Sequence, residues 1–310
     1  MNSMIITSLA SFSNMITIGI LIKSCPQCTY LISLAQFIAI FIIQCILLFA
    51  NGLHRPKVPL KQYFKIALLY FLHQVLSFRC LSYKVSIPLQ SVLKSSNLLL
   101  NIFIGKLFLG RHYCQNKYLA AFLVTIGTIS ITINDQSFQN DSSSHQMIFG
   151  LFLLFSSIVI STILQLIQEQ TFIKYGKHVG ECVFYTNIMS LVPSLFLFTD
   201  IIDEFTLAST VPDIEVKLLH QFSFFISFWV ILMIRVIGGY FFTRANSNLI
   251  STNGSLTMML FGTVRRFVNL ILGMYFSGTT FYPFQWISTC LVFIGVLIYS
   301  DKIWPFKKKE

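Results

Sequence analysis

The stretch MMLFGTVRRFVNLILGMYF, residues 258–276, places two adjacent arginines in the middle of an apolar run. A helix needs about 20 apolar residues to cross the hydrocarbon core of a bilayer, and this run has that length. An arginine at the centre of such a helix costs roughly 2.5–3.5 kcal/mol on insertion scales, so it is usually compensated by a partner. Arg265 and Arg266 therefore pose two questions: whether the chain is a membrane protein, and what compensates their charge.

The composition of the chain is that of an integral membrane protein. Of its 310 residues 55% are hydrophobic and only 11% are charged, and the mean hydropathy is +0.73. An average soluble domain has about 25% charged residues. The first apolar run lacks the basic flank and cleavage site of a signal peptide, so we expect it to be a membrane helix. We predict ten membrane spans and no soluble domain: 4–22, 29–50, 63–82, 88–109, 116–134, 147–169, 182–199, 219–243, 252–276 and 284–301.

Charged residues alternate between the predicted links. Basic residues fall in the links at 55–61, 111–117 and 174–177, at Arg244 and in the tail, whereas most acidic residues fall in 135–141 and 200–215. Cytoplasmic loops carry an excess of Lys and Arg. We therefore expect both termini in the cytosol and the acidic links in a lumen. The net charge of +11 then reflects topology, and nucleic-acid binding is not needed to explain it.

An internal repeat relates the two halves of the chain. Residues 96–129 align without a gap onto residues 264–297, and the alignment matches Asn101 with Asn269 and Gly105 with Gly273. The link in the first copy is basic and the link in the second is uncharged, which places them on opposite sides of the membrane. We predict an all-α membrane protein with ten transmembrane helices in two inverted five-helix repeats, as in many transporters. The repeats are 1–134 and 147–303, with a lumenal link at 135–146 and a cytosolic tail at 304–310.

Charge inside the predicted spans has one sign. None of the 11 acidic residues lies deep in a span, whereas five basic residues do: Arg79, Lys94, Arg235, Arg265 and Arg266. A cationic cavity without a counter-ion favours an anionic substrate, and the guanidinium group is suited to phosphate. We predict that Lys94 and Arg265 bind this substrate. For Arg79 and Arg235 we favour a structural role, in which they pair with backbone carbonyls or reach an interface.

Three stretches resemble the nucleotide-sugar transporter family, in its branch for UDP-xylose and UDP-N-acetylglucosamine. They are QEQTFIKYGKHVGECVFYTNIMSLVPSLFLFTDI, SIPLQSVLKSSNLLLNIFIGKLFLGR and SLTMMLFGTVRRFVNLIL. The resemblance implies a ten-helix antiporter of the ER or Golgi membrane that imports one or both of these nucleotide-sugars in exchange for UMP. It also implies that Lys94, Arg265 and Arg266 contact the nucleotide phosphates, and that an aromatic and amide motif lies at Phe184, Tyr185 and Asn187.

The predicted substrate-binding residues combine the basic groups with polar residues at helical spacing: Lys94, Asn97, Asn101, Tyr185, Asn187, Arg265, Arg266 and Asn269. Packing between helices would explain the asparagines equally well. Tyr185 could stack on a base or anchor a helix end at the membrane interface.

The sequence leaves other functions open. The same fold could carry another phosphorylated nucleotide, such as an adenine nucleotide or a sulfonucleotide. A proton-coupled drug exporter would need a carboxylate in the early helices, and the first span has none. We find no cluster with catalytic or metal-binding character, so we expect no enzyme, metal or cofactor. The expected partners are a nucleotide-sugar, a nucleoside monophosphate and the lipid bilayer, while the oligomeric state, a homo-oligomer included, is left open.

The C-terminal tail PFKKKE has lysines at its fourth and third places from the end, Lys307 and Lys308. This resembles the dilysine retrieval signal that vesicle coat proteins read, and it predicts residence in the endoplasmic reticulum or early Golgi. Alternatively, the lysines only follow the positive-inside rule. Two further local features are undecided: Cys25 and Cys28 form a disulfide or stay as thiols rather than bind metal, and Asn140 lies in a glycosylation sequon.

Overall fold

The protein is described here by a computed structural model of the chain. The residues that it describes are 2–50, 56–83, 85, 89–90, 93–109, 118–120, 122–124, 126–127, 130, 144–212, 214–218, 222–277 and 283–299. The sequon at Asn140 and the lysines of the tail lie outside these residues.

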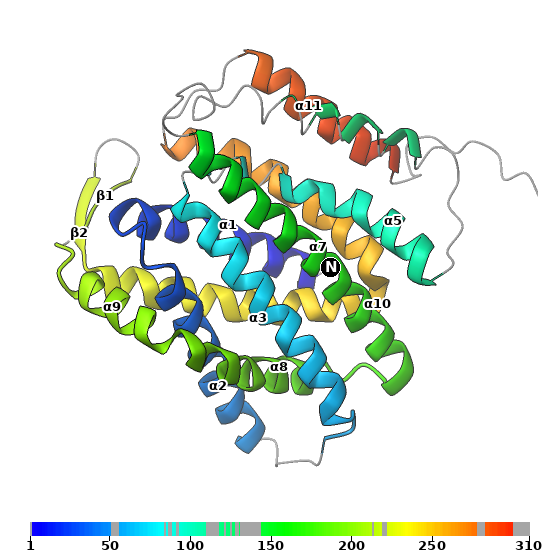
Figure 1. Cartoon of the computed structure of the whole chain (residues 1–310), viewed down its shortest axis with the longest axis horizontal. Helices are drawn as coiled ribbons and strands as arrows, with labels where there is room; N and C mark the ends of the chain where they lie inside the picture. Colours follow the sequence, from blue (N-terminus) through cyan, green and yellow to red (C-terminus); the bar gives the residue numbers. More distant parts are fainter. Residues whose placement is uncertain are drawn as a thin grey trace, which may run out of the picture.

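Helices make up nearly all of the described structure (Figure 1). In chain order they are α1 (Asn2–Ser24), α2 (Thr29–Ala50), α3 (Leu60–Ser82), the 3-10 turn η1 (Lys94–Ser96), α5 (Asn97–Leu109), α7 (Ser144–Tyr175), α8 (Val179–Ser194), the 3-10 turn η4 (Leu195–Leu197), α9 (Phe198–Ser209), α10 (Phe228–Ser277) and α11 (Pro283–Tyr299). Two short strands, β1 (Ile214–Leu218) and β2 (Phe222–Ile226), pair antiparallel between α9 and α10.

Six helical segments of the described chain are long and apolar enough to cross a membrane: Met4–Ser24, Thr29–Leu47, Leu60–Ser82, Gln146–Tyr175, Val179–Ser209 and Phe228–Ser255. They overlap six of the predicted spans. Four further helical elements add to these six: α5, the helical turns within 118–130, the second part of α10, and α11. The chain is therefore an all-α membrane protein with about ten helices. This confirms the predicted class, while the inverted repeat stays a prediction.

The helix α10 contains a sharp break at Gly254. Its backbone has φ 83° and ψ 166° there, a left-handed conformation that glycine adopts without steric cost. The chain turns back at this residue, so that the second part of α10 runs above the first in Figure 1. The predicted link at 244–251 is therefore wrong: these residues are helical, and a single residue makes the turn.

The region between α8 and α10 also differs from the prediction. Residues 200–215 were expected to be a link, but most of them form α9 and the start of β1, and the predicted span 219–243 begins as strand β2. The helix α9 is amphipathic and buries Ile201, Glu204 and Ala208 against its neighbours. Hydropathy alone could not separate this helix from a loop, because it combines apolar residues with three acids.

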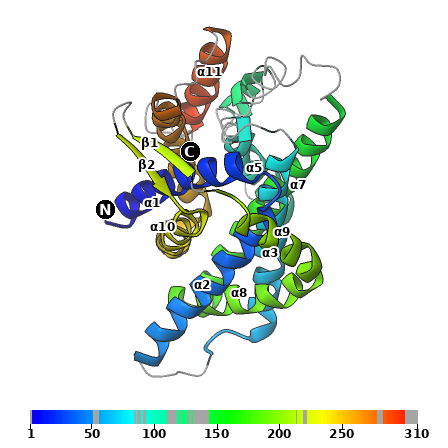
Figure 2. The same ribbon diagram turned by 90° about the vertical axis from the view of Figure 1, so that its left-hand side faces the viewer.

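Two apolar clusters of the core lie at different heights along the first part of α10. One cluster contains Leu21, Ile32 and Phe228, and the other contains Tyr63 and Leu249. Phe228 and Leu249 both lie on the first part of α10, and at 1.5 Å per residue they are about 30 Å apart. Helix α1 packs along α10, and α3 contacts both α7 and α8 (Figures 1 and 2).

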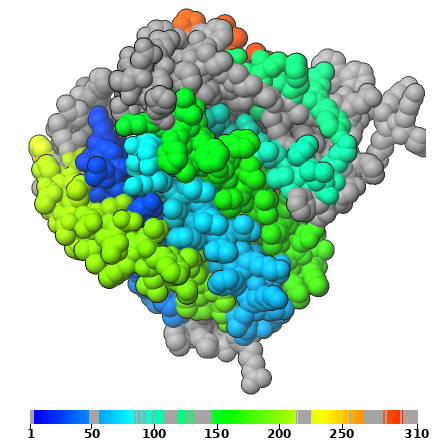
Figure 3. Space-filling model, viewed as in Figure 1, coloured from blue at the N-terminus to red at the C-terminus, as the bar shows by residue number. Residues whose placement is uncertain are grey.

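Apolar side chains cover much of the outer surface. On the face shown in Figure 3, the side chains of α3 lie between those of α7 and those of α9. Exposed residues of α3 and α7 include Leu68, Leu72, Phe149, Phe152 and Phe155. Large exposed apolar side chains on two neighbouring helices are expected where a bundle contacts lipid.

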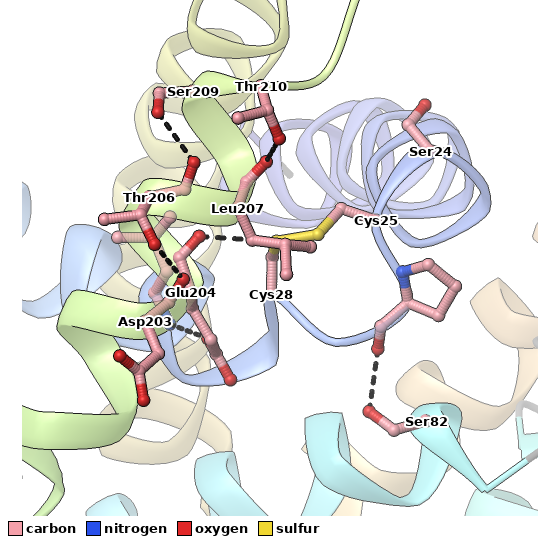
Figure 4. The surroundings of a disulfide bond; sticks show 12 residues. Ser24, Cys25, Cys28, Ser82, Asp203, Glu204, Thr206, Leu207, Ser209 and Thr210 are labelled. Carbon is pink, nitrogen blue, oxygen red and sulfur yellow. Dashed lines mark hydrogen bonds between the residues drawn. A yellow bond between two sulfur atoms is a disulfide. The ribbon is translucent and has the colours of Figure 1, made fainter.

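The turn between α1 and α2 holds a disulfide between Cys25 and Cys28, which decides between the two states left open by the sequence (Figure 4). Helix α9 packs on this turn. The Glu204 carboxylate accepts a hydrogen bond from the backbone N–H of Leu31 at 2.7 Å, and the disulfide sulfur of Cys28 lies 3.7 Å from the Glu204 carbonyl oxygen.

Glu204 is a buried acidic residue in a segment that was expected to be a link. It is only 7% exposed, and one carboxylate oxygen lies 3.9 Å from the guanidinium group of Arg79. Arg79 also stacks over the ring of Tyr30, at 4.7 Å from the ring centroid. The structural role predicted for Arg79 is supported, but its partners are a carboxylate and an aromatic ring rather than backbone carbonyls.

Candidate functional site

A cavity of about 300 Å³ lies inside the bundle, and Ile250 and Met258 of the second apolar cluster are among its lining residues. Its walls come from α1, α2, α3, η1, α5, α7, α8 and both parts of α10. This volume is at the lower end of the range for small-molecule sites, which is about 300–1,000 Å³. Most of the membrane-spanning helices therefore contribute side chains to one internal space.

Four cationic side chains line this cavity: Lys94, Arg235, Arg265 and Arg266. The described residues of its wall include no Asp or Glu. Two of the cations, Arg235 and Arg265, are each only 6% exposed. Because charge in a membrane interior is costly without compensation, this arrangement favours an anion as the occupant of the cavity.

A chain of hydrogen bonds joins α3, η1 and the second part of α10. The ammonium group of Lys94 donates to the hydroxyl of Ser77 at 2.6 Å, and the guanidinium group of Arg266 donates to the backbone carbonyl of Lys94 at 2.6 Å. The side chain of Gln90 donates to the carbonyl of Ser77 at 2.6 Å. These contacts hold Lys94 and Arg266 in one part of the wall. An ammonium group has three N–H donors, and the bond to Ser77 uses one of those of Lys94.

The guanidinium group of Arg265 lies between aromatic rings. It is 4.6 Å from the ring centroid of Phe242 and 5.8 Å from that of Phe261. One of its N–H groups donates to the Asn246 side chain at 3.4 Å, and its Nε has no hydrogen-bond partner among the described residues. The rings pack against the flat cation, and part of its hydrogen-bonding edge is unused among the described residues.

Arg235 is a member of the cavity wall that the sequence did not assign to the site. Its guanidinium group donates to the side-chain oxygen of Asn14 at 3.1 Å and lies 5.6 Å from the ring centroid of Phe78. No motif marks this residue. The signal that could have found it is the adjacent pair Gly238–Gly239, because small residues in a membrane helix often mark a close approach of neighbouring helices.

The predicted site residues Asn97 and Asn101 have different positions. Asn97 lines the cavity, and its amide is bonded to two hydroxyls of α7: it donates to Ser161 at 2.9 Å and accepts from Thr162 at 2.5 Å. Asn101 is fully buried, does not line the cavity and has no side-chain hydrogen-bond partner among the described residues. Asn97 thus joins α5 to α7 at the edge of the cavity.

Only part of the aromatic and amide motif of α8 lines the cavity. Asn187 lines the cavity; its amide nitrogen donates to the carbonyl of Val183 at 2.7 Å, and its oxygen has no partner among the described residues. Tyr185 is not part of the wall, and its ring stacks on that of Tyr63 at a centroid distance of 5.2 Å. The side chain of Asn269 lies outside the described part of the chain.

A family model described as the UAA transporter family matches residues 2–303, nearly the whole chain. The chain belongs to the UAA transporter family. It is therefore a membrane transporter rather than an enzyme, as the sequence predicted, and its family is one of nucleotide-sugar transporters.

Named relatives of this UAA family member support the assignment. The chain is 27% identical to the UDP-xylose and UDP-N-acetylglucosamine transporter of Danio rerio, over 93% of this chain and 90% of that protein. It is 27% identical to the nucleotide sugar transporter SLC35B4 of Homo sapiens, over 94% and 90% of the two chains. It is also 26% identical to the endoplasmic reticulum GDP-fucose transporter of Drosophila melanogaster, over 94% and 87%.

A solved structure shares the fold of this UAA transporter. A protein crystal structure superposes on it with a TM-score of 0.60, covering 94% of this chain and 95% of the other. The two sequences are only 12% identical, so the likeness concerns the fold alone. The helical arrangement around the cavity thus recurs in a protein with a very different sequence.

Proposed function

We propose that this transporter exchanges a UDP-sugar, UDP-N-acetylglucosamine or UDP-xylose or both, for UMP across an ER or Golgi membrane. The observation that carries the proposal is the cavity lined by Lys94, Arg235, Arg265 and Arg266, with no carboxylate among its described lining residues. A nucleoside diphosphate sugar brings its own negative charge. It would supply the counter-ion that the wall lacks.

The cationic wall also suggests why transport should be an exchange. With an anion bound, the charge of the cavity is largely compensated; without one, several cations must face a closed, poorly hydrated space. Passage of the empty carrier through the closed state should therefore be slow. A nucleoside monophosphate offers the same phosphate chemistry for the return step.

The choice of the uridine nucleotides rests on the names of the relatives. UDP-xylose and UDP-N-acetylglucosamine appear in the name of the Danio relative, whereas the Drosophila relative is named for GDP-fucose. The identities of 27% and 26% are nearly equal, so GDP-fucose belongs in the same experimental panel.

The proposal includes an arrangement of the chain in the membrane. Residues 1–134 and 147–303 would form two inverted repeats that meet at the cavity, with both termini in the cytosol. Two inverted halves around one midplane site allow the cavity to open to either side. The substrate-binding residues would be the eight predicted from the sequence, of which Lys94, Asn97, Asn187, Arg265 and Arg266 line the cavity.

Purified transporter in proteoliposomes tests this function. Vesicles loaded with UMP or GMP are offered radiolabelled UDP-N-acetylglucosamine, UDP-xylose or GDP-fucose, and empty vesicles serve as the control. We expect UDP-sugar uptake that depends on internal UMP and is unchanged when an uncoupler collapses a proton gradient. Uptake into empty vesicles at the same rate, or a strong uncoupler effect, would contradict the exchange; uptake of GDP-fucose alone would replace the proposed substrate.

A further inference from the structure

Two adjacent glycines on α10 leave space for a cluster of polar side chains in the cavity wall, apart from the one around Lys94 and Arg266. A Cβ at Gly238 would lie 2.7 Å from the side-chain oxygen of Asn14, on α1. A Cβ at Gly239 would lie 3.0 Å from the guanidinium NH1 of Arg235 and 3.2 Å from the amide carbon of Gln36, on α2. Any larger side chain at these positions would displace the polar groups. The glycine pair therefore brings Asn14, Arg235 and Gln36 together.

This group, which we call the glycine-pair pocket, has unused hydrogen-bonding capacity. Arg235 donates to Asn14, and Gln36 donates to the Tyr70 hydroxyl at 3.4 Å. The Nε of Arg235 and the Oε1 of Gln36 are buried without a hydrogen-bond partner among the described residues. Burying such groups is costly unless a ligand or water satisfies them. The Nε of Arg235 is a charged donor, the Oε1 of Gln36 is an acceptor, and both residues line the cavity.

The glycine-pair pocket is separated from Arg265 along the cavity. Arg265 contacts Phe242 and Asn246, which follow Arg235 by seven and eleven positions on the same helix. The guanidinium group of Arg235, however, reaches forward to Gly239, which precedes Phe242 by three positions and Asn246 by seven. At 1.5 Å per residue these positions are about 5 and 10 Å further along the axis, so the two guanidinium groups occupy successive parts of the cavity wall.

The surroundings of the two regions differ and suggest which part of a ligand each one suits. Aromatic rings flank Arg265, and such surfaces favour a flat base. Arg235 lies over one ring, that of Phe78, but amides and a phenol also gather on its side of the wall: Asn14, Gln36, Tyr70 and Gln74 all line the cavity. Paired donors and acceptors of this kind suit the hydroxyls of a sugar, and a guanidinium group suits a phosphate oxygen.

We propose that the glycine-pair pocket binds the part of a nucleotide-sugar that the nucleoside monophosphate lacks, namely the second phosphate and the sugar. This rests on the proposed function. Arg235 donates to an oxygen of the sugar-linked phosphate, and Gln36 accepts a hydrogen bond from a sugar hydroxyl. The base and first phosphate lie toward Arg265 and Arg266. Arg235 and Gln36 are thus specificity-determining residues for the long substrate and contribute little to the short one.

Two exchange reactions in the same vesicles test this division. Vesicles loaded with UMP are offered radiolabelled UDP-N-acetylglucosamine, or radiolabelled UMP for self-exchange, and the apparent KM is measured for each. Arg235→Gln should raise the KM for the nucleotide-sugar by about tenfold or more, as expected for a lost charged hydrogen bond, and the KM for UMP by less than about twofold. Gln36→Met should act in the same direction more weakly. Arg244→Gln is the matched control, because it removes the same charge from α10 outside the cavity wall.

The outcomes separate this inference from the proposed function. If wild-type vesicles exchange UMP and the nucleotide-sugar, the function stands, and the ratio of the two KM changes decides the pocket. Equal effects of Arg235→Gln and Gln36→Met on both reactions, or no effect on either, overturn the inference alone. UMP self-exchange also reports folding, and if Arg235→Gln is inactive in both reactions, Gln36→Met decides, since it leaves every charge in place. Wild-type vesicles that exchange neither compound overturn both proposals.

Discussion

The guanidinium group of Arg266 donates a 2.6 Å hydrogen bond to the backbone carbonyl of Lys94, 172 positions earlier in the chain. Lys94 in turn donates to Ser77 of α3. One cation thus holds the backbone that carries another, and both side chains line the cavity. In the predicted repeat, the region that begins at η1 corresponds to the second part of α10. If that predicted repeat holds, the bond joins its two related segments.

The first prediction concerns Arg265. Arg265→Ala should abolish exchange of both nucleotide-sugar and nucleoside monophosphate, because it removes the proposed ligand of the phosphate. The protein should still insert and fold, although it loses the contacts with Phe242 and Phe261. Arg265→Lys should restore exchange only in part, since an ammonium group cannot make the paired bonds of a guanidinium group. Initial uptake rates in proteoliposomes measure both effects, and gel filtration in detergent checks the folding. Full uptake by Arg265→Ala would remove this residue from the site.

The second prediction concerns the contact between Ser77 and Lys94. Ser77→Ala removes the hydroxyl that accepts the 2.6 Å bond from the ammonium group, so Lys94 should lose its fixed position but keep its charge. We expect a rise of about three- to tenfold in the KM for both substrates, which corresponds to a lost hydrogen bond of about 0.5–1.5 kcal/mol. Lys94→Ala should have a much larger effect. Ser156→Ala is the control, because Ser156 lies on α7 outside the cavity wall. Equal kinetics for Ser77→Ala and the control would show that this bond does not position Lys94.

The sequence predicted the membrane class and the positive charge of the cavity wall for simple physical reasons. A bilayer demands long apolar runs, and a cation inside such a run is conspicuous wherever it lies. Lys94, Arg265 and Arg266 were found in this way, and all three line the cavity. Boundaries were less certain, because a polar stretch can stay helical and a helix can turn at one residue. The polar residues 244–251 were predicted to form a link, yet they are helical, and Gly254 divides α10.

Partners across the bundle could not be predicted, because they depend on how distant segments pack. Glu204 looked like part of a polar link, yet α9 folds back and buries its carboxylate beside Arg79. Arg235 looked structural, yet it lies in the wall of the cavity. In both cases the charge was visible in the sequence, whereas the neighbour that gives it a role lies far away in the chain: Asn14 is 221 positions from Arg235.

The third prediction concerns the compartment. If Lys307 and Lys308 are read as a retrieval signal, replacing both by serine should move the protein outward to later Golgi membranes. Lys302 and Lys309 still follow the last span in this variant, so topology should be kept. Fluorescence imaging with the tag at the N-terminus leaves the C-terminus free. Serine at Lys302 and Lys309 is the matched control, because it removes the same charge. An unchanged location of the Lys307/Lys308 variant would contradict the signal and leave the transport proposal intact.

The fourth prediction concerns the contact between α9 and the turn that carries the disulfide. The carboxylate of Glu204 accepts a bond from Leu31 and faces Arg79, so Glu204→Gln should leave Arg79 without its counter-ion. Because the side chain of Arg79 is 33% exposed, we expect a loss of only about 1–2 kcal/mol, well below that for breaking a fully buried pair. Glu204→Ala should cost more, since it also leaves the N–H of Leu31 without an acceptor. Thermal unfolding in detergent measures the changes.

A matched control and a double variant make this test specific. Asp203→Asn removes the same charge at an exposed position one residue earlier, and it should leave the unfolding temperature nearly unchanged. Arg79→Gln combined with Glu204→Gln should recover part of the stability lost by Glu204→Gln alone, because no unpaired charge is then left beside the turn. The KM values for both substrates should stay near wild type, since neither Arg79 nor Glu204 lines the cavity. If the two single variants and the double variant lose stability additively, the two side chains act independently and the ion pair does not hold α9 on the turn.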